Sequence, residues 1–449
     1  MRSIVAMLAF LLLSAPAMAQ DALPGQTGPR AAPTTRVEVQ QLPVMDSTPA
    51  FDPDQATEKY LARVNGPARA RSDAYFEGGY VLQLVDLIYG LAVAAILLWL
   101  GLSARLRDWV GARTRNRLFQ AIIYVAAYSA FVAAASFPLT VYEGFFREHA
   151  YGLSNQDFWQ WLSDYGIAFA VSLIGSLIIV PIIYAAIRSA GKVWWVWGAA
   201  ITIFFAAIAM VIFPVFIAPL FNHYSALPDG PLKKEVLSLA RANDIPAENV
   251  WTFDASRQSD RISANVSGFL GTTRISLNDN LLKQASHDEI LAVMGHEMGH
   301  YVMGHTMRGL LLNGLVIFAA FAFIHWGFVF ATDLFGGQWQ VRRTDDIAGL
   351  PLLLALGSLF LFFATPVTNS ITRTMEHQAD IFGVNAVRKP DAFATAILKL
   401  SAYRKLDPGK WEEIIFYDHP SGRSRIETVM RWKKEHIGDV DMRGTENTP

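Results

Sequence analysis

The 449-residue sequence contains no cysteine. This absence excludes thiol catalysis, disulfide bonds and thiolate metal ligands, so the protein ligands of any metal must be His, Asp or Glu. It leaves the compartment open, because a cysteine-free chain tolerates any redox environment. Charge is also scarce, since 17% of the residues are charged and the formal net charge is −1. With no basic patch among interleaved aromatic residues, no nucleic-acid partner is expected.

Apolar residues are abundant instead and make up 52% of the chain. Six segments approach the length that an α-helix needs to cross a bilayer, which is about 20 residues. The sequence therefore predicts a mainly α-helical chain built on a polytopic membrane helix bundle. The same spans would suit a transporter or channel, which is the alternative from another functional class. The predicted spans are residues 82–103, 118–141, 167–187, 193–220, 309–331 and 347–371.

The N-terminus has the layout of a secretory signal peptide, in which a basic residue precedes an apolar run. Ala17 and Ala19 then offer a cleavage site between small residues. We expect residues 1–19 to be a signal peptide, and a short uncleaved anchor is the alternative. Residues 20–79, rich in Pro, Ala, Thr and Gln in their first half, are predicted to form a flexible exported segment with a short helix around 55–64.

Basic residues are distributed unevenly between the predicted spans. Five arginines between positions 105 and 117 crowd the first connection, whereas Arg147 is the only arginine or lysine in the second, 142–166. Connections rich in Arg and Lys stay in the cytoplasm. The first connection is therefore predicted to be cytoplasmic. By counting spans, residues 221–308 fall on the outer (periplasmic) face of the cell (inner) membrane, the side to which the N-terminal segment would be exported.

A metal-binding pattern occurs as His-Glu-Met-Gly-His at residues 296–300. Residues four apart share one face of an α-helix, so His296 and His300 could bind one Zn²⁺. Glu297 is the natural base for a water molecule that the metal activates. Ser286 and Glu289 form a capping box, which predicts that a helix begins there. The alternative is a helix carrying two solvated or core histidines.

A catalytic zinc site normally has a third protein ligand. The best candidate is Glu376, because Asp380 follows on the same helical face and could accept a hydrogen bond from the free ring nitrogen of a ligand histidine. Judged from spacing alone, Glu376 and Asp380 could equally well lie on a solvated face of the helix. Gly295 and Gly299 each precede one of the histidines, and they indicate either close packing of another backbone against the metal helix or room for substrate.

These motifs and others make the sequence resemble the type I CAAX prenyl endopeptidases and their bacterial relatives, which are integral-membrane zinc proteases of the gluzincin type. The resemblance covers most of the chain, from about residue 73 to 436. Ser424 departs from the family pattern, which has glutamate before the arginine, and allows a different substrate preference. The matching segments are Ile-Ala-Pro-Leu-Phe at 217–221, Leu-Pro-Asp-Gly at 227–230, Ser-Ala-Asn at 263–265 before Arg-Ile-Ser-Leu at 274–277, Gly-His-Glu-Met-Gly-His at 295–300 with Gly-His at 304–305, Glu-His-Gln-Ala-Asp at 376–380, and His-Pro at 419–420 with arginine at 425.

The resemblance implies roles that spacing leaves open. It makes Glu376 the third ligand of one Zn²⁺ per chain. It makes His419 and Arg425 candidates for stabilising the oxyanion of the tetrahedral intermediate. Asn265 is implied as a contact to the substrate backbone, and His305 as a structural residue or a support for the metal ligands. The implied partners are the lipid bilayer and a peptide or membrane-associated protein substrate.

The predicted organisation is a membrane bundle interrupted by a gluzincin-type zinc metalloprotease domain, which contains a small β element near residues 250–277. A heat-shock-type membrane-protein quality-control metalloprotease is the alternative enzyme. The matches at 217–230 and 265–277 favour the prenyl-endopeptidase branch. The predicted parts are four spans within 80–220, a first catalytic part with the metal helix at 221–308, two spans within 309–371, and a second catalytic part at 372–449.

Overall fold

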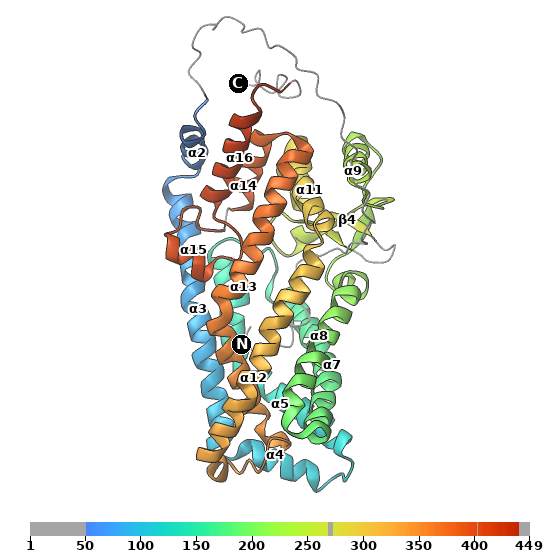
Figure 1. Cartoon of the computed structure of the whole chain (residues 1–449), viewed down its shortest axis with the longest axis vertical. Helices are drawn as coiled ribbons and strands as arrows, with labels where there is room; N and C mark the ends of the chain where they lie inside the picture. The colour runs from blue at the N-terminus through green and yellow to red at the C-terminus, as the bar shows by residue number, and fades with distance from the viewer. Residues whose placement is uncertain (1–50, 268–272, 402, 440–449) are drawn as a thin grey trace, which may run out of the picture.

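The computed structural model describes residues 51–267, 273–401 and 403–439. They form an elongated helical bundle with a small β-sheet towards one end (Figure 1). The predicted signal peptide, 1–19, lies outside the described residues. The helices are α2 (Pro53–Leu61), α3 (Gly66–Trp99), α4 (Leu102–Gly111), α5 (Arg117–Val141), α6 (Glu148–Ala150), α7 (Phe158–Ala190), α8 (Trp194–Ile212), α9 (Pro231–Ala242), α10 (Asp279–Gln284), α11 (His287–Val302), α12 (His305–Trp339), α13 (Leu350–Val387), α14 (Pro390–Leu400), α15 (Lys410–Phe416) and α16 (Gly422–His436), and the strands are β1 (Tyr224–Ala226), β2 (Val250–Phe253), β3 (Ala264–Ser267) and β4 (Arg274–Asn278).

Five stretches of the described chain are long and apolar enough to cross a membrane. The longest, Phe158–Leu220, contains two helices, α7 and α8, which are separated by the short 3₁₀ turn Gly191–Val193 and pack against each other. The six predicted spans therefore lie in α3, α5, α7, α8, α12 and α13. Large apolar side chains such as Leu315 and Phe330 are exposed on these helices, as expected for surfaces that face lipid. The predicted membrane bundle is confirmed.

The segment 20–79 differs from its prediction as a flexible region. From residue 53 onwards its described part is helical, in α2 and the first turns of α3. The short helix expected around 55–64 is α2, which packs on α14 and α16. Its Tyr60 donates a hydrogen bond of 2.7 Å to Asp391. This contact joins residues far apart in the sequence, so composition alone could not reveal that the segment is held in place.

The sheet has four strands in the order β1-β2-β4-β3, with β3 at one edge. β2 and β4 run parallel, and the two outer pairs are antiparallel. Buried Val266 and Ile275 pack in one apolar core with Met294 and Met298 of α11. The sheet thus contains the predicted β element, extended by β1, and it supports one face of α11.

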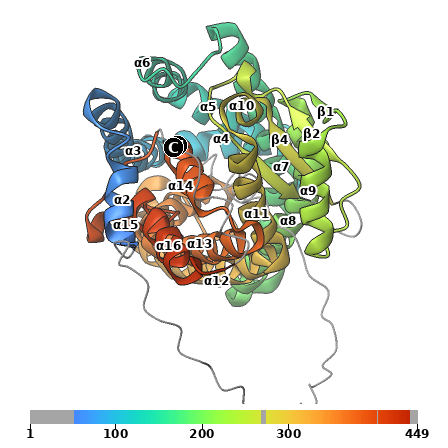
Figure 2. The same cartoon turned by 90° about the horizontal axis from the view of Figure 1, so that it is seen from above.

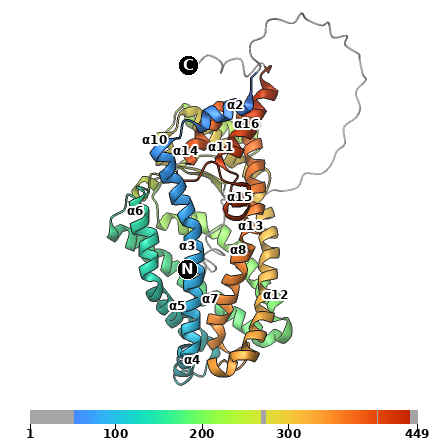
Figure 3. The same ribbon diagram turned by 90° about the vertical axis from the view of Figure 1, so that its left-hand side faces the viewer.

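α13 connects the membrane bundle to the domain that contains the sheet. Its 38 residues span about 57 Å at 1.5 Å per residue, enough to cross a bilayer and continue beyond it. The predicted boundary at residue 372 therefore falls inside one continuous helix. Seen from above, α11 lies between the sheet with α9 on one side and α13, α14 and α16 on the other (Figure 2). α3 runs along the bundle from α4 towards this domain (Figure 3).

Candidate metal centre

α11 carries the first three candidate residues, and local sequence explains where it starts. Ser286 Oγ accepts a hydrogen bond from the backbone N–H of Glu289, while Glu289 Oε2 accepts one from the N–H of Ser286. The predicted capping box is therefore confirmed. From this start the helix places His296 and His300 one turn apart on the same buried face.

Glycines bring α13 against this face of α11. A Cβ atom added at Gly383 of α13 would lie 2.7 Å from the backbone nitrogen of His296, and one at Gly295 would lie 3.0 Å from the Gly383 carbonyl oxygen. One at Gly299 would lie 3.1 Å from Ala379 Cα. The expectation that the two α11 glycines mark close backbone packing is confirmed. The close approach of the helices places Glu376 opposite the histidines.

Three donor groups converge between α11 and α13. The Nε2 atoms of His296 and His300 are 3.1 Å apart, and Glu376 Oε2 and Oε1 lie 3.2 Å and 3.4 Å from them respectively. Two nitrogens that each bind zinc at about 2.0–2.1 Å in a tetrahedron are separated by about 3.3 Å. Glu376 Oε2 is buried without a hydrogen bond of good geometry among the described residues. The donor types and their convergence fit a metal ion.

Acidic groups surround His296 and favour positive charge there. Its Nδ1–H donates to Asp380 Oδ1 over 2.8 Å, and Asp380 is fully buried. Burial alone would lower the pKa of His296, but its hydrogen bonds with Asp380 and Glu376 raise the pKa to about 10. The site therefore stabilises a cation at this point, which is a second sign that it suits a metal.

Glu297 lies beside this cluster but is not one of the converging donors. Its side chain lines the adjacent cavity together with His296 and Glu376. Burial raises the pKa of the Glu297 carboxyl above its usual value. A carboxylate whose proton affinity is increased in this way accepts a proton more readily. The geometry thus separates Glu297 from the donor set, as predicted for a base.

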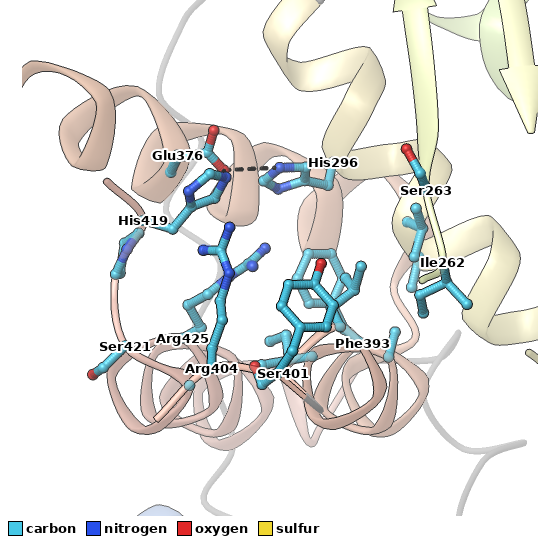
Figure 4. A pocket seen from close by; sticks show the side chains of 18 of the residues that line it. Ile262, Ser263, His296, Glu376, Phe393, Ser401, Arg404, His419, Ser421 and Arg425 are labelled. Carbon is cyan, nitrogen blue, oxygen red and sulfur yellow. Dashed lines mark ion pairs between the residues drawn. The ribbon is translucent and has the colours of Figure 1, made fainter. Parts of the chain in front are cut away.

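The cavity next to the donors has a volume of about 190 Å³. Figure 4 shows Glu376, His296 and His419 along one side of it, with Ile262 and Ser263 at another and Phe393 and Ser401 below. Its apolar part comes largely from α14, through Phe393, Ile397 and neighbouring residues. No sequence pattern marks this apolar wall, because α14 has the same apolar pattern as any helix packed in a core.

His419 and Arg425 both reach the cavity, but in different ways. His419 Nε2 lies 3.3 Å from Glu376 Oε2, and its Nδ1 is paired with Asp418. Arg425 is buried, and its Nε and Nη2 donate to the two oxygens of Asp380 over 2.8 Å and 2.6 Å. Two of its nitrogens are therefore directed at Asp380, which is a different contact from the predicted oxyanion.

Asn265 lies on β3 opposite Ser276 of β4. The cavity is lined by Ile262, Ser263 and Ala264, just before it, and not by Asn265 itself. Because β3 is an edge strand, its outer side has no strand partner among the described residues. The predicted role of Asn265 therefore depends on a peptide that extends past the cavity along this edge.

Comparisons with known proteins agree with the metal centre that the geometry indicates. Residues 226–433 match the model of peptidase family M48, and residues 60–223 match that of the CAAX prenyl protease N-terminal region with five membrane helices. The uncharacterized metalloprotease YhfN of Bacillus subtilis (strain 168) is 31% identical over 334 residues, which cover 74% of this chain and 78% of the relative. The chain belongs to peptidase family M48. The predicted resemblance is thereby confirmed.

Other relatives of this chain carry a prenyl protease name. The CAAX prenyl protease 1 homolog of Oryza sativa subsp. japonica is 26% identical, covering 73% of this chain and 77% of the relative. CAAX prenyl protease 1 of Saccharomyces cerevisiae is 27% identical, covering 68% and 71%. The crystal structure of S. mikatae Ste24p has the same fold, with a TM-score of 0.68 and 21% identity, covering 84% of this chain and 94% of the other.

Membership of M48 confirms several predictions. The protein is a zinc-dependent, multi-pass membrane metalloprotease that hydrolyses peptide bonds. The transporter and heat-shock alternatives are not favoured, since both parts of the chain match this family and its prenyl-protease branch.

Proposed function

We propose that this M48 peptidase cleaves peptide substrates at a zinc centre held by His296, His300 and Glu376. The observation that carries the proposal is the convergence of these three donors within 4.8 Å, all buried and beside a cavity that Glu297 lines. Zn²⁺ held there would polarise the scissile carbonyl and make a water molecule more acidic. The remaining chemistry belongs to the side chains around it.

Glu297 is the general base in this proposal. It takes a proton from the attacking water, and its raised pKa lets it keep that proton until the leaving amine accepts it. His419 reaches the cavity next to Glu376 and donates a hydrogen bond to the developing oxyanion. Arg425 acts chiefly by holding Asp380, because two of its nitrogens already bond that carboxylate.

The substrate in this proposal is an extended peptide that pairs with the free edge of β3. An edge strand offers unpaired N–H and C=O groups, to which a peptide can add as another strand. A peptide in this place runs past Ser263 and Ala264 into the cavity and reaches Asn265 farther along. The relatives named CAAX prenyl proteases support prenylated peptides as candidate substrates.

The test of the mechanism separates the base from the ligands. Glu297→Gln keeps the shape of the side chain but cannot take a proton, so peptide hydrolysis should fall by about 10²–10⁴-fold. Zinc content, measured by elemental analysis of the purified protein, should stay at one ion per chain. Glu248→Gln, an exposed glutamate in the same domain, is the control and should remain active. Loss of zinc in Glu297→Gln would show that Glu297 is a ligand.

We also propose that the zinc centre lies on the outer, periplasmic face of the cell (inner) membrane. The arginines at positions 105 and 107 lie on α4, at the end of the bundle opposite the sheet and α11 (Figure 1). If the positive-inside rule keeps α4 in the cytoplasm, the sheet and α11 face outward. A cytoplasmic centre is the alternative, and it would require that the arginine-rich connection be outside.

Cysteine labelling tests the orientation, because the chain has no cysteine of its own. A membrane-impermeant thiol reagent on intact cells should label Asn155→Cys and Gly438→Cys, at the sheet end, but not Ala112→Cys, next to α4. All three should label after the cells are lysed. Labelling of Ala112→Cys alone in intact cells would place the zinc centre in the cytoplasm.

A further inference from the structure

His296 and His300 differ in what supports the ring nitrogen that faces away from the donor cluster. Asp380 accepts from Nδ1 of His296, whereas the atom facing Nδ1 of His300 is Nδ1 of another histidine, His305, at 3.0 Å. His305 is the first residue of α12 and is fully buried. Its other ring nitrogen, Nε2, lies 3.1 Å from Oε1 of Gln378 on α13.

The backbone between α11 and α12 makes this contact possible. Gly304 adopts the left-handed conformation with φ of 60°, which favours glycine, and it turns the chain between the two helices. The turn brings the His305 ring against that of His300, with ring centroids 5.0 Å apart. His305 is therefore placed by the local turn, whereas Gln378 comes from a distant part of the sequence.

Only one placement of protons on Gln378, His305 and His300 leaves His300 able to bind a metal. A neutral imidazole has one N–H donor and one acceptor nitrogen. Because Gln378 Oε1 can only accept, Nε2 of His305 must donate to it. Nδ1 of His305 then carries a lone pair and accepts from Nδ1–H of His300. With its proton on Nδ1, His300 directs the lone pair of Nε2 towards Glu376 and His296.

We propose that His305 and Gln378 are positioning residues that hold His300 in the tautomer and orientation needed to bind zinc. The proposal rests on the ligand role of His300 proposed above. It assigns the two histidines of α11 different supports, a buried carboxylate held by Arg425 for His296 and a neutral imidazole–amide pair for His300. Such supporting hydrogen bonds typically change metal affinity by about 10–100-fold.

Paired substitutions distinguish this role from simple packing. His305→Phe keeps a ring but removes both nitrogens, and Gln378→Leu removes the acceptor at similar volume. His305→Gln restores an acceptor for His300 and a donor for Gln378, while Gln378→Glu restores an acceptor for His305. Zinc affinity of the full-length protein in detergent can be measured by competition with a chelator. It should fall by about 10–100-fold in His305→Phe and Gln378→Leu, and stay within a few fold of native in His305→Gln and Gln378→Glu.

Several outcomes would overturn the proposal. Unchanged affinity in His305→Phe together with a loss in His305→Gln would show that the ring only fills space, and unchanged affinity in all four variants would show that His300 needs no such support. His300→Ala in the same assay tests the underlying ligand assignment. If His300→Ala keeps its zinc, the proposed ligand set fails; if it loses zinc while His305→Phe does not, only the positioning role fails.

A second observation points to a lipid site on the membrane side of the same helices. A groove of about 650 Å³ lies between α12 and α13 and is lined by Arg308, Leu312, Val367, Ile371, Thr374 and other residues. Arg308 is exposed, and no hydrogen-bond acceptor or acidic partner contacts its side chain among the described residues. The groove therefore combines an apolar wall with one unpaired positive charge.

The depth of the groove in the membrane follows from the exposed residues of α12. Large exposed apolar side chains recur on this helix from Met307 to Phe335. This stretch is about 42 Å long at 1.5 Å per residue, which exceeds a hydrocarbon core of about 30 Å. Arg308 lies in the first turn of this stretch, which places it at the level of lipid headgroups, while Leu312 and Val367 lie at the level of the acyl chains.

We propose that the groove binds a glycerophospholipid of the surrounding bilayer, with its phosphate on Arg308 and an acyl chain along Leu312, Val367 and Ile371. A guanidinium matches a phosphate in charge and hydrogen-bond geometry. The apolar wall lies where a bilayer lipid would place its chain. This proposal does not depend on the zinc ligands, although Gln378 also lines the groove.

Native mass spectrometry of the full-length protein with added phosphatidylglycerol tests this site. Arg308→Gln should bind about tenfold less tightly, as expected for the loss of a charge-assisted hydrogen bond. Ile371→Trp, which fills the groove without changing charge, should also reduce the lipid-bound fraction. Arg241→Gln removes an arginine on α9, away from the groove, and should bind lipid as the native protein does. Equal lipid binding in Arg308→Gln and Arg241→Gln would overturn the proposal.

Discussion

His296 and His300 are the same residue type on the same face of one helix, yet their surroundings differ. His296 is supported by an ionised carboxylate that Arg425 holds in place, and His300 contacts a neutral histidine. The charged support is buried and strengthens His296 as a metal ligand, but it requires an intact ion pair between Asp380 and Arg425. The neutral support involves no buried charge. Equivalent positions in a helical motif can thus depend on different parts of the fold.

Removing a ligand itself should have the largest effect and should not distinguish the two histidines. His296→Ala, His300→Ala and Glu376→Ala should each lose most of the bound zinc, because two ligands hold the ion poorly. Elemental analysis of the purified proteins measures this. His287→Ala, which replaces a half-exposed histidine in the first turn of the same helix, is the matched control. Full zinc content in Glu376→Ala would show that another residue is the third ligand.

Asp380→Asn should sharpen the comparison, because it removes the charged support and leaves the shape. Zinc affinity should fall by about 10–100-fold. The buried charge of Arg425 loses its partner, so the free energy of unfolding should also fall, by about 3–5 kcal/mol. Chelator competition and thermal unfolding measure the two effects. Asp288→Asn, which breaks an exposed pair on α11, should change neither appreciably.

A double substitution separates the two consequences of Asp380→Asn. Adding Arg425→Met removes the unpaired charge, so stability should recover while zinc affinity stays low. If zinc affinity recovered as well, the effect of Asp380 would come from the buried charge and not from its bond to His296.

A smaller effect is expected from the packing that both histidines share. In Gly383→Ala the new methyl group would lie 2.7 Å from the His296 backbone nitrogen and 2.9 Å from Phe393. The helices must separate slightly, which should lower the free energy of unfolding by about 1–3 kcal/mol. Gly438→Ala, with no neighbouring atom within 4 Å of the new methyl group, should be neutral in the same thermal unfolding assay.

The smallest effect is expected at the start of α11, before either histidine. Ser286→Ala removes the cap and should lower the free energy of unfolding by about 1 kcal/mol, with zinc affinity unchanged. Ser286→Asp supplies another capping oxygen and should restore stability. A loss of zinc in Ser286→Ala would mean that the end of the helix is coupled to the metal centre, contrary to the local role of the cap.

Much of this protein could be read from local pattern. The capping box at Ser286 gives the start of α11, and a run of about 20 apolar residues is enough to indicate a span, because each feature depends on neighbouring residues. The helical spacing of His296 and His300 likewise predicts a shared face. The prediction that residues 20–79 are flexible was wrong from residue 53 onwards, because contacts with helices that are distant in the sequence hold α2 in place.

The sequence by itself determined the class of chemistry, the membrane bundle and the helix that carries two of the donors. Spacing alone left Glu376 open, since a carboxylate on an isolated helix looks the same whether it faces solvent or a metal. Tertiary structure decided it, because the glycine-lined contact of α11 with α13 brings that carboxylate within 3.4 Å of both histidines. The same contact placed Asp380 and Gln378 behind different histidines, a distinction that depends on how two distant helices meet.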